Sequence, residues 1–152
     1  MKTLQELKDY RESMEAEYGK CTVLKVNIDN EKTNCSNTGN RSAKNGWSWI
    51  DYWRSMTGTS KTQLFCSSCG KVIFVGSTPK MMENMFAATG DKAENHTAIG
   101  GHIWVEAPKF AKYKGGRYIT PLCPHCNAQH GKKINIKKGS LLCKELGADV
   151  QE

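Results

Sequence analysis

The sequence predicts an α+β fold built around a four-cysteine metal centre. Two CxxC pairs, Cys66 with Cys69 and Cys123 with Cys126, are separated by 53 residues. Two apolar, β-prone stretches, residues 98–107 and 115–123, lie between the pairs, and a short helix is expected from Cys126. Helical patterns precede the first pair and also lie between the pairs. Together these features predict a strand, turn, strand and helix held by metal, with helices added around them.

Length and composition predict a single domain over residues 1–152. The chain has 152 residues, of which 38% are hydrophobic, enough to bury a core. Residues 1–60 are expected to elaborate a metal-binding ββα core at 61–140. No apolar run approaches the ~20 residues that a membrane span needs, and the charged start does not resemble a signal peptide. An odd count of seven cysteines also suits a reducing compartment. We therefore expect a cytoplasmic, intracellular protein with no membrane contact.

The N-terminal elaboration is expected to begin with a helix and a strand. Apolar residues recur at helical spacing over 2–18, and Gly19 follows as a helix stop. Residues 21–29 alternate apolar and polar side chains, which predicts a strand. Residues 30–46 are rich in Asn, Ser and Gly, which predicts a long loop.

Two further helices are expected. Residues 47–58 bring three tryptophans and a tyrosine together, with Ser48 placed to cap the helix and Gly58 to end it. Residues 77–90 combine Pro79 at the first helical position, a Met-rich face and Gly90 at the exit. We expect both the aromatic cluster and the Met-rich face to pack in the core.

The two CxxC pairs predict a structural Zn2+ site with the ligands Cys66, Cys69, Cys123 and Cys126. Two residues between cysteines let one tight turn aim both sulfur atoms at a single ion, and two pairs complete a tetrahedral set of four. Thiolate ligands favour zinc over Mg2+ or Ca2+, with an iron or iron-sulfur centre as an alternative. His130 could replace one cysteine in a CCCH variant. A thioredoxin-like redox role lacks the βαβ context that it requires.

The arrangement resembles the treble-clef zinc proteins and, among them, the zinc-bearing HNH endonucleases. The resemblance covers Cys66 to about Lys133 and rests on "CSSCGK", "GGHIWV" and "YITPLCPHCN". It implies that His102 is the general base and that Asn127 is a ligand of a catalytic Mg2+ or Mn2+. Two positions differ from the family's pattern: Gly101 stands where an acidic metal ligand is expected, and Tyr118 where an asparagine is expected. We therefore expect the core to be HNH-like but not catalytic.

The net charge of +7 is concentrated in one segment. Residues 107–144 contain nine Lys or Arg and no Asp or Glu, which is typical of a surface that meets phosphate or an acidic protein. We expect DNA or RNA as the partner, and Arg117 is the best candidate for a bidentate phosphate contact. The expected nucleic-acid-binding residues are Lys109, Lys112, Lys114, Arg117, Lys132, Lys133, Lys137 and Lys138.

Three functions follow from these features. The first is a zinc-stabilised nucleic-acid-binding protein with a non-catalytic HNH-like core. The second is an HNH-type endonuclease that depends on a divalent metal. The third is a small interaction or inhibitor protein, of the kind that phages and mobile elements encode, acting through an acidic surface of a nucleic-acid-processing or defence protein.

Overall fold

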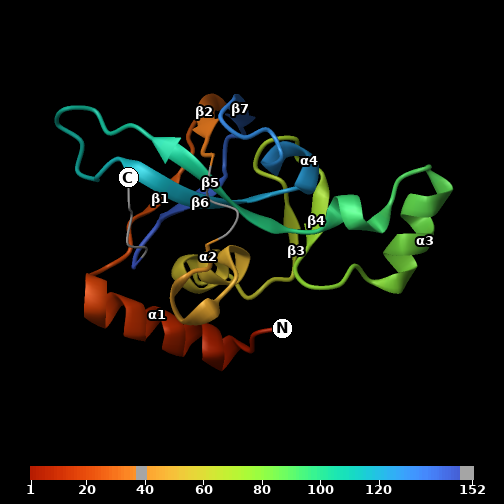
Figure 1. The fold of residues 1–152 in the computed structure, drawn as a ribbon, viewed down its shortest axis with the longest axis horizontal. Helices are drawn as coiled ribbons and strands as arrows, with labels where there is room; N and C mark the ends of the chain where they lie inside the picture. Colours follow the sequence, from red (N-terminus) through yellow and green to blue (C-terminus); the bar gives the residue numbers. More distant parts are fainter. Residues whose placement is uncertain (37–40, 148–152) are drawn as a thin grey trace.

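Six strands form one antiparallel sheet in the order β1-β8-β6-β5-β2-β7 (Figure 1). The computed structural model describes residues 1–36 and 41–147. The strands of this sheet are β1 (Val23–Lys25), β2 (Asn30–Asn34), β5 (Ile99–Val105), β6 (Gly116–Leu122), β7 (Lys133–Ile136) and β8 (Leu141–Lys144). A separate two-stranded sheet joins β3 (Gln63–Phe65) to β4 (Val72–Phe74).

Both edges of the large sheet come from one two-stranded ribbon. β1 pairs with β8, and β2 pairs with β7. The two pairings keep the same register, with Lys25 opposite Leu141 and Asn30 opposite Ile136, so β1–β2 and β7–β8 form one continuous antiparallel ribbon. β8 also pairs with β6, and β2 also pairs with β5. The ribbon therefore runs along both sides of the β5–β6 hairpin, and the sheet has to curve. Its inner face packs buried aliphatic side chains from the hairpin and the ribbon, among them Ile103, Leu122, Ile136 and Leu142.

α2 (Trp49–Thr57) covers the outer face of the sheet and α1 (Leu4–Tyr18) packs on α2, as Figure 1 shows below the sheet. α1 starts with a capping box in which Thr3 and Glu6 bond each other's backbone. α2 is capped by Ser48 and ends at Gly58 in the left-handed conformation. The Ser55 hydroxyl donates a hydrogen bond of 2.5 Å to the Leu7 carbonyl and so joins the two helices. Both helices lie where the sequence pattern predicts them.

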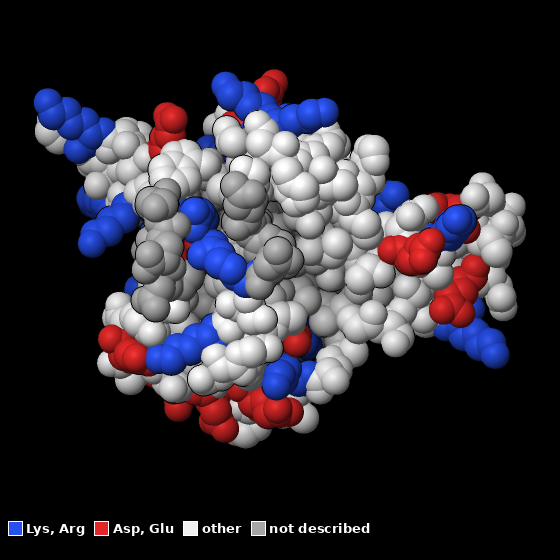
Figure 2. All heavy atoms as spheres, in the orientation of Figure 1, with Lys and Arg blue, Asp and Glu red and all other residues white. Residues whose placement is uncertain are grey.

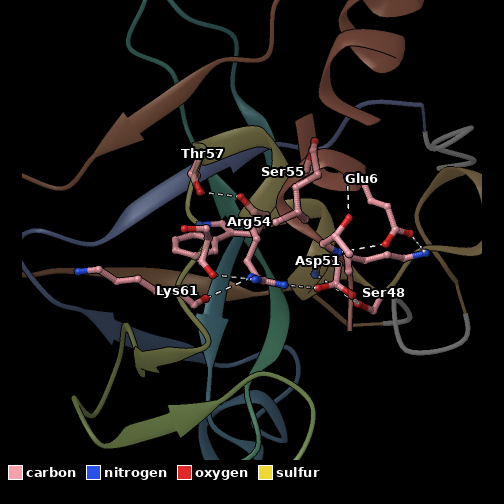
Figure 3. A network of polar contacts seen from close by, with 12 residues as sticks. Glu6, Ser48, Asp51, Arg54, Ser55, Thr57 and Lys61 are labelled. Carbon is pink, nitrogen blue, oxygen red and sulfur yellow. Dashed lines mark hydrogen bonds and ion pairs between the residues drawn. The ribbon is translucent and has the colours of Figure 1, made fainter. Parts of the chain in front are cut away.

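Arg54 holds the chain that leaves α2. Its guanidinium is buried and lies 3.0 Å from a carboxylate oxygen of Asp51. Its other nitrogens donate to the carbonyls of Ser60 and Lys61 (Figure 3). A buried arginine with a carboxylate and two carbonyls is well satisfied, so Arg54 fixes the path from α2 to β3 and hence to the first cysteine pair.

The aromatic cluster belongs to the core, as expected. Trp47, Trp49, Tyr52 and Trp53 are all buried. The ring of Trp47 stacks on Tyr10 of α1 with centroids 3.7 Å apart. This cluster packs α1 and α2 together and onto the sheet.

The Met-rich face is not in the core, contrary to expectation. α3 (Lys80–Ala88) projects from the body of the protein in Figure 1 and packs mainly on the short 3-10 helix η2 (Ala93–His96). Phe86 is the residue of α3 that is buried, and its ring stacks on His96 at 3.6 Å. Met81 is 70% exposed and Met85 is 55% exposed. A single buried aromatic residue is enough to seat this helix, so Met81 and Met85 face outward while Met82 is half-buried.

The expected loop at 30–46 contains a central strand instead. β2 lies between β5 and β7 and pairs with both. Another short 3-10 helix, η1 (Lys44–Gly46), ends the segment, and residues 37–40 lie outside the described part of the chain. The strand expected at 21–29 is shorter than predicted, because β1 covers Val23–Lys25 and Ile28 is exposed.

Candidate metal centre

The first cysteine pair lies on the turn between β3 and β4. The Cys66 amide donates to the Lys71 carbonyl, and the Gly70 amide donates to the Cys66 carbonyl, both at 2.9 Å. Gly70 has a φ of 80°, which a residue with a side chain rarely adopts. The turn thus needs a glycine directly after Cys69, and it brings both sulfur atoms to one side.

The second pair lies where β6 runs into α4 (Pro124–Asn127). Cys123 is the N-cap of this short helix, and its sulfur accepts a hydrogen bond of 3.4 Å from the Cys126 amide. Pro124 occupies the first helical position, where its missing N–H costs nothing. The two strands predicted between the pairs are present as β5 and β6. The helix expected from Cys126 is the four-residue α4, which starts at Pro124 and ends at Asn127.

The four sulfur atoms converge. Those of Cys66, Cys69, Cys123 and Cys126 all lie within 4.8 Å of one another, and the Cys69 and Cys123 sulfurs are 3.7 Å apart. A tetrahedral zinc site with Zn–S bonds of ~2.3 Å has sulfur separations of about 3.8 Å. The cluster is therefore compatible with a structural metal ion such as zinc. His125 and His130 are exposed and are not in this group.

Two contacts beside the cysteines brace the cluster. The Ser67 amide donates to the Pro121 carbonyl at 2.9 Å, which joins the first turn to β6. The Ser67 and Thr120 hydroxyls are buried and 2.6 Å apart. These bonds hold the β3–β4 turn against the strand that carries Cys123, so the two pairs are positioned by the protein as well as by any ion.

Burial and hydrogen bonding shift the pKa values of the Cys126 and Cys66 thiols in opposite directions. Burial and the neighbouring thiol of Cys66 raise the pKa of Cys126 well above its usual value. Burial also acts to raise the pKa of Cys66, but hydrogen bonds from backbone groups of Cys69, Cys123 and Ser68 outweigh it and lower the pKa. Like charges in one buried site resist joint ionisation. A dication at the centre would stabilise all four thiolates.

Asn34 supports the second pair and was not predicted. Its side-chain amide is buried and donates to the carbonyls of Cys126 at 3.4 Å and Asn127 at 3.0 Å. Both carbonyls lie at the C-terminal end of α4, where the helix supplies few donors, and the Cys126 carbonyl also accepts from the Gln129 amide at 3.3 Å. Asn34 lies in a polar segment whose sequence resembles a loop, so no local signal marks it as a core residue.

The two residues to which the HNH resemblance gives catalytic roles, His102 and Asn127, lie on different sides of β5. His102 is 3% exposed and lies on the outer face of β5, where its ring meets Trp49 of α2 edge-on at 4.6 Å. A side chain at the adjacent Gly101 would point to the inner face, and its Cβ would lie 3.1 Å from the Asn127 side-chain oxygen. His102 and Asn127 thus lie on opposite faces of the strand.

His102 belongs to a buried polar cluster with Glu145. The His102 Nε2 atom lies 3.5 Å from a Glu145 carboxylate oxygen, and Arg41 Nη2 lies 3.3 Å from the same oxygen. Arg117 Nη1 approaches the second oxygen at 4.0 Å. The Glu145 side chain is fully buried. This arrangement gives His102 a role in packing the end of β8 against α2, and it explains why Arg117 is turned away from solvent.

The expected nucleic-acid-binding lysines are all exposed and lie in three places. Lys109, Lys112 and Lys114 belong to the loop between β5 and β6. Lys133 starts β7 and lines a hollow with Trp104 at the base of this loop, and Lys132 directly precedes it. The knuckle group, Lys137 and Lys138, follows β7 and lies beside the first cysteine turn. The Lys137 amide donates to the Ser67 carbonyl at 2.7 Å.

Comparisons with known proteins give no relative: no family model, no curated protein and no solved structure matches the chain. The resemblance to the HNH endonucleases therefore rests on the sequence motifs alone. Within the described residues no helix is long and apolar enough to cross a membrane.

Proposed function

We propose that this chain is a zinc-stabilised nucleic-acid-binding protein whose β5–β6 hairpin loop contacts phosphates. The observation that carries the proposal is a hollow of about 580 Å³ beside the loop, which Lys20, Lys112, Lys114 and Lys144 line together with Tyr18 and Tyr113. Its described lining contains no Asp or Glu. Four amines around one hollow produce a positive electrostatic potential, which favours the binding of an anion there.

Lys144 is the most enclosed amine of this hollow. Burial lowers its pKa, and the nearby charges of Lys114 and Arg117 add to this effect against the opposing charge of Glu145. Its amine lies 5.6 Å from the centroid of the Tyr118 ring. A phosphate placed in the hollow would compensate the crowded positive charge and would gain a charge-assisted hydrogen bond.

A second hollow of about 410 Å³ flanks the other side of the hairpin. Lys32 and Lys133 line it with Trp104, which is 42% exposed. Glu31 and Glu106 also line it, so it is less strongly basic. Figure 2 shows Lys and Arg at the end of the projecting loop, whereas Asp and Glu are mixed with Lys and Arg along the lower edge, where α1 lies. The end of the loop is therefore the more uniformly basic part of this face and favours contact with a polyanion.

Salt dependence tests this function. If six of the exposed lysines each neutralise a phosphate, log affinity falls with log salt concentration at a slope of about −5. Replacing Lys109, Lys112 and Lys114 by Ala would reduce that slope by about 3. The matched control replaces Lys8, Lys61 and Lys80, three exposed lysines that lie outside the hairpin and are not among the expected binding residues. Affinity that does not respond to salt, or a control with the same loss, would overturn the proposal.

A second candidate, the interaction or inhibitor protein, is favoured by α3. This helix projects from the body and exposes Met81 and Met85, an adaptable apolar pair that can pack on a partner. A binding experiment distinguishes the two functions by the kind of ligand that the protein retains. A nucleic-acid-binding protein retains purified DNA or RNA, whereas an inhibitor binds only an acidic protein, and that binding is lost in Met81→Glu.

A further inference from the structure

The tip of the β5–β6 loop carries an aromatic side chain with almost no protein around it. Phe110 is 90% exposed, more than any other large apolar residue described. The Ala111 amide donates to the Pro108 carbonyl at 2.9 Å, which closes a four-residue turn with Lys109 and Phe110 at its apex. Phe110 is therefore presented by a defined turn.

The loop behind this turn is fixed at its base. The Tyr118 hydroxyl of β6 donates to the Lys114 carbonyl at 2.7 Å. Tyr113 is half-buried and packs against the hydrophobic core. These two tyrosines anchor the returning limb, so the apex projects from the sheet at the upper left of Figure 1. An exposed ring on an anchored projection loses little conformational freedom when it binds.

One amine lies beside the ring, and two more follow in the loop. The Lys109 amine lies 5.8 Å from the centroid of the Phe110 ring. Lys112 and Lys114 follow on the limb that borders the four-lysine hollow. An aromatic side chain between amines matches the chemistry of a nucleic acid, in which flat bases alternate with phosphates.

We propose that Phe110 inserts between bases of a bound duplex and unstacks one base step, while the lysines beside it hold the flanking phosphates. This inference rests on the proposed nucleic-acid binding and deepens it. Proteins that bend a duplex use apolar wedges of this kind and recover the cost of unstacking through additional contacts. A lipid bilayer is the less suitable target, because one phenyl ring buries too little apolar surface for stable attachment.

The test uses duplexes that contain 2-aminopurine, a base whose fluorescence rises when it is unstacked, with a DNA duplex and an RNA duplex of the same sequence as two arms. We expect wild-type protein to raise the fluorescence of at least one duplex. Phe110→Ala should abolish the rise and weaken binding by roughly 5- to 150-fold, and Phe110→Trp should restore both. Phe65→Ala is the matched control, since Phe65 is also exposed (64%) but lies on β3.

The outcomes separate this inference from the function on which it rests. If wild-type protein binds neither duplex, the proposed function fails. If it binds a duplex but Phe110→Ala binds equally and the fluorescence does not change, the wedge fails and the function stands. Equal loss in Phe65→Ala, or binding to anionic phosphatidylserine vesicles that depends on Phe110 in the absence of duplex binding, would also overturn the wedge.

Discussion

The side-chain amide of Asn34 donates a hydrogen bond of 3.0 Å to the carbonyl of Asn127 and so ties β2 to the helix of the second cysteine pair. A buried carbonyl without a partner is costly. Asn34→Ala should therefore lower the free energy of unfolding by about 1–3 kcal/mol in metal-replete buffer, measured by urea denaturation. Asn135→Ala, at an exposed position on β7, is the control and should change stability by less than about 0.5 kcal/mol. Equal values for the two variants would show that the bond contributes little.

Gly100 lies directly against the backbone of α2, and the space between them has no room for a side chain. A Cβ at this position would lie 2.4 Å from the carbonyl carbon of Trp49, a backbone atom that cannot rotate away. Gly100→Ala should cost about 1–3 kcal/mol of stability by shifting α2. At Gly101 the clash is with the buried Leu122 side chain at 2.3 Å. A side chain can shift with less disturbance than the backbone of a helix, so Gly101→Ala should cost less. A thermal unfolding series checks the order, and the reverse order would contradict it.

Glu145 is expected to be a major contributor to stability. Its fully buried carboxylate lies near Arg41, His102 and Arg117. Removing one member of a buried ionic cluster leaves the others uncompensated, so Glu145→Ala should cost about 3–5 kcal/mol. The exposed pair of Glu17 with Lys44 provides the comparison, and Glu17→Ala should cost under ~1 kcal/mol. Chemical denaturation of both variants tests the contrast, and similar losses would refute it.

Asp91 should make the α3–η2 unit sensitive to acid. Hydrogen bonds from the Asn95 side chain, the His96 ring and the Lys92 amide lower the pKa of Asp91 from 3.8 to about 2. A lowered carboxyl pKa stabilises the folded form above the unfolded value, and this contribution is lost as pH falls from about 4 through about 2. NMR titration should give a midpoint near 2 for Asp91, and amide exchange in α3 should rise over the same range. A midpoint near 4 would contradict this account, and Asp91→Asn should remove the pH dependence.

The elements with local signals are those that the sequence predicts well. Both α1 and α2 carry capping residues and helical periodicity, and the convergence of the four cysteines follows from the spacing within each pair. The unpredicted strands have three to five residues and depend on partners distant in sequence. β2 is the clearest case, because its polar side chains give no strand pattern and its position is fixed by pairing with β5 and β7.

For the candidate site, too, the sequence predicts some features and not others. Cysteine spacing predicts the four residues whose sulfur atoms converge, but the face on which a strand residue lies depends on the register of the whole sheet. His102 therefore matches a catalytic motif in sequence while its side chain packs against Trp49. Similarly, the methionines of α3 have helical spacing, yet the spacing does not say whether another element covers them.

The metal content of the purified protein tests the central claim most directly. Elemental analysis of wild-type protein should find one equivalent of a transition metal per chain, expected to be zinc. Cys126→Ser should lose this metal together with solubility, since structural zinc sites supply ~10–16 kcal/mol in small domains, whereas Cys35→Ser, outside the cluster, should retain it. Folded wild-type protein without stoichiometric metal would contradict the account.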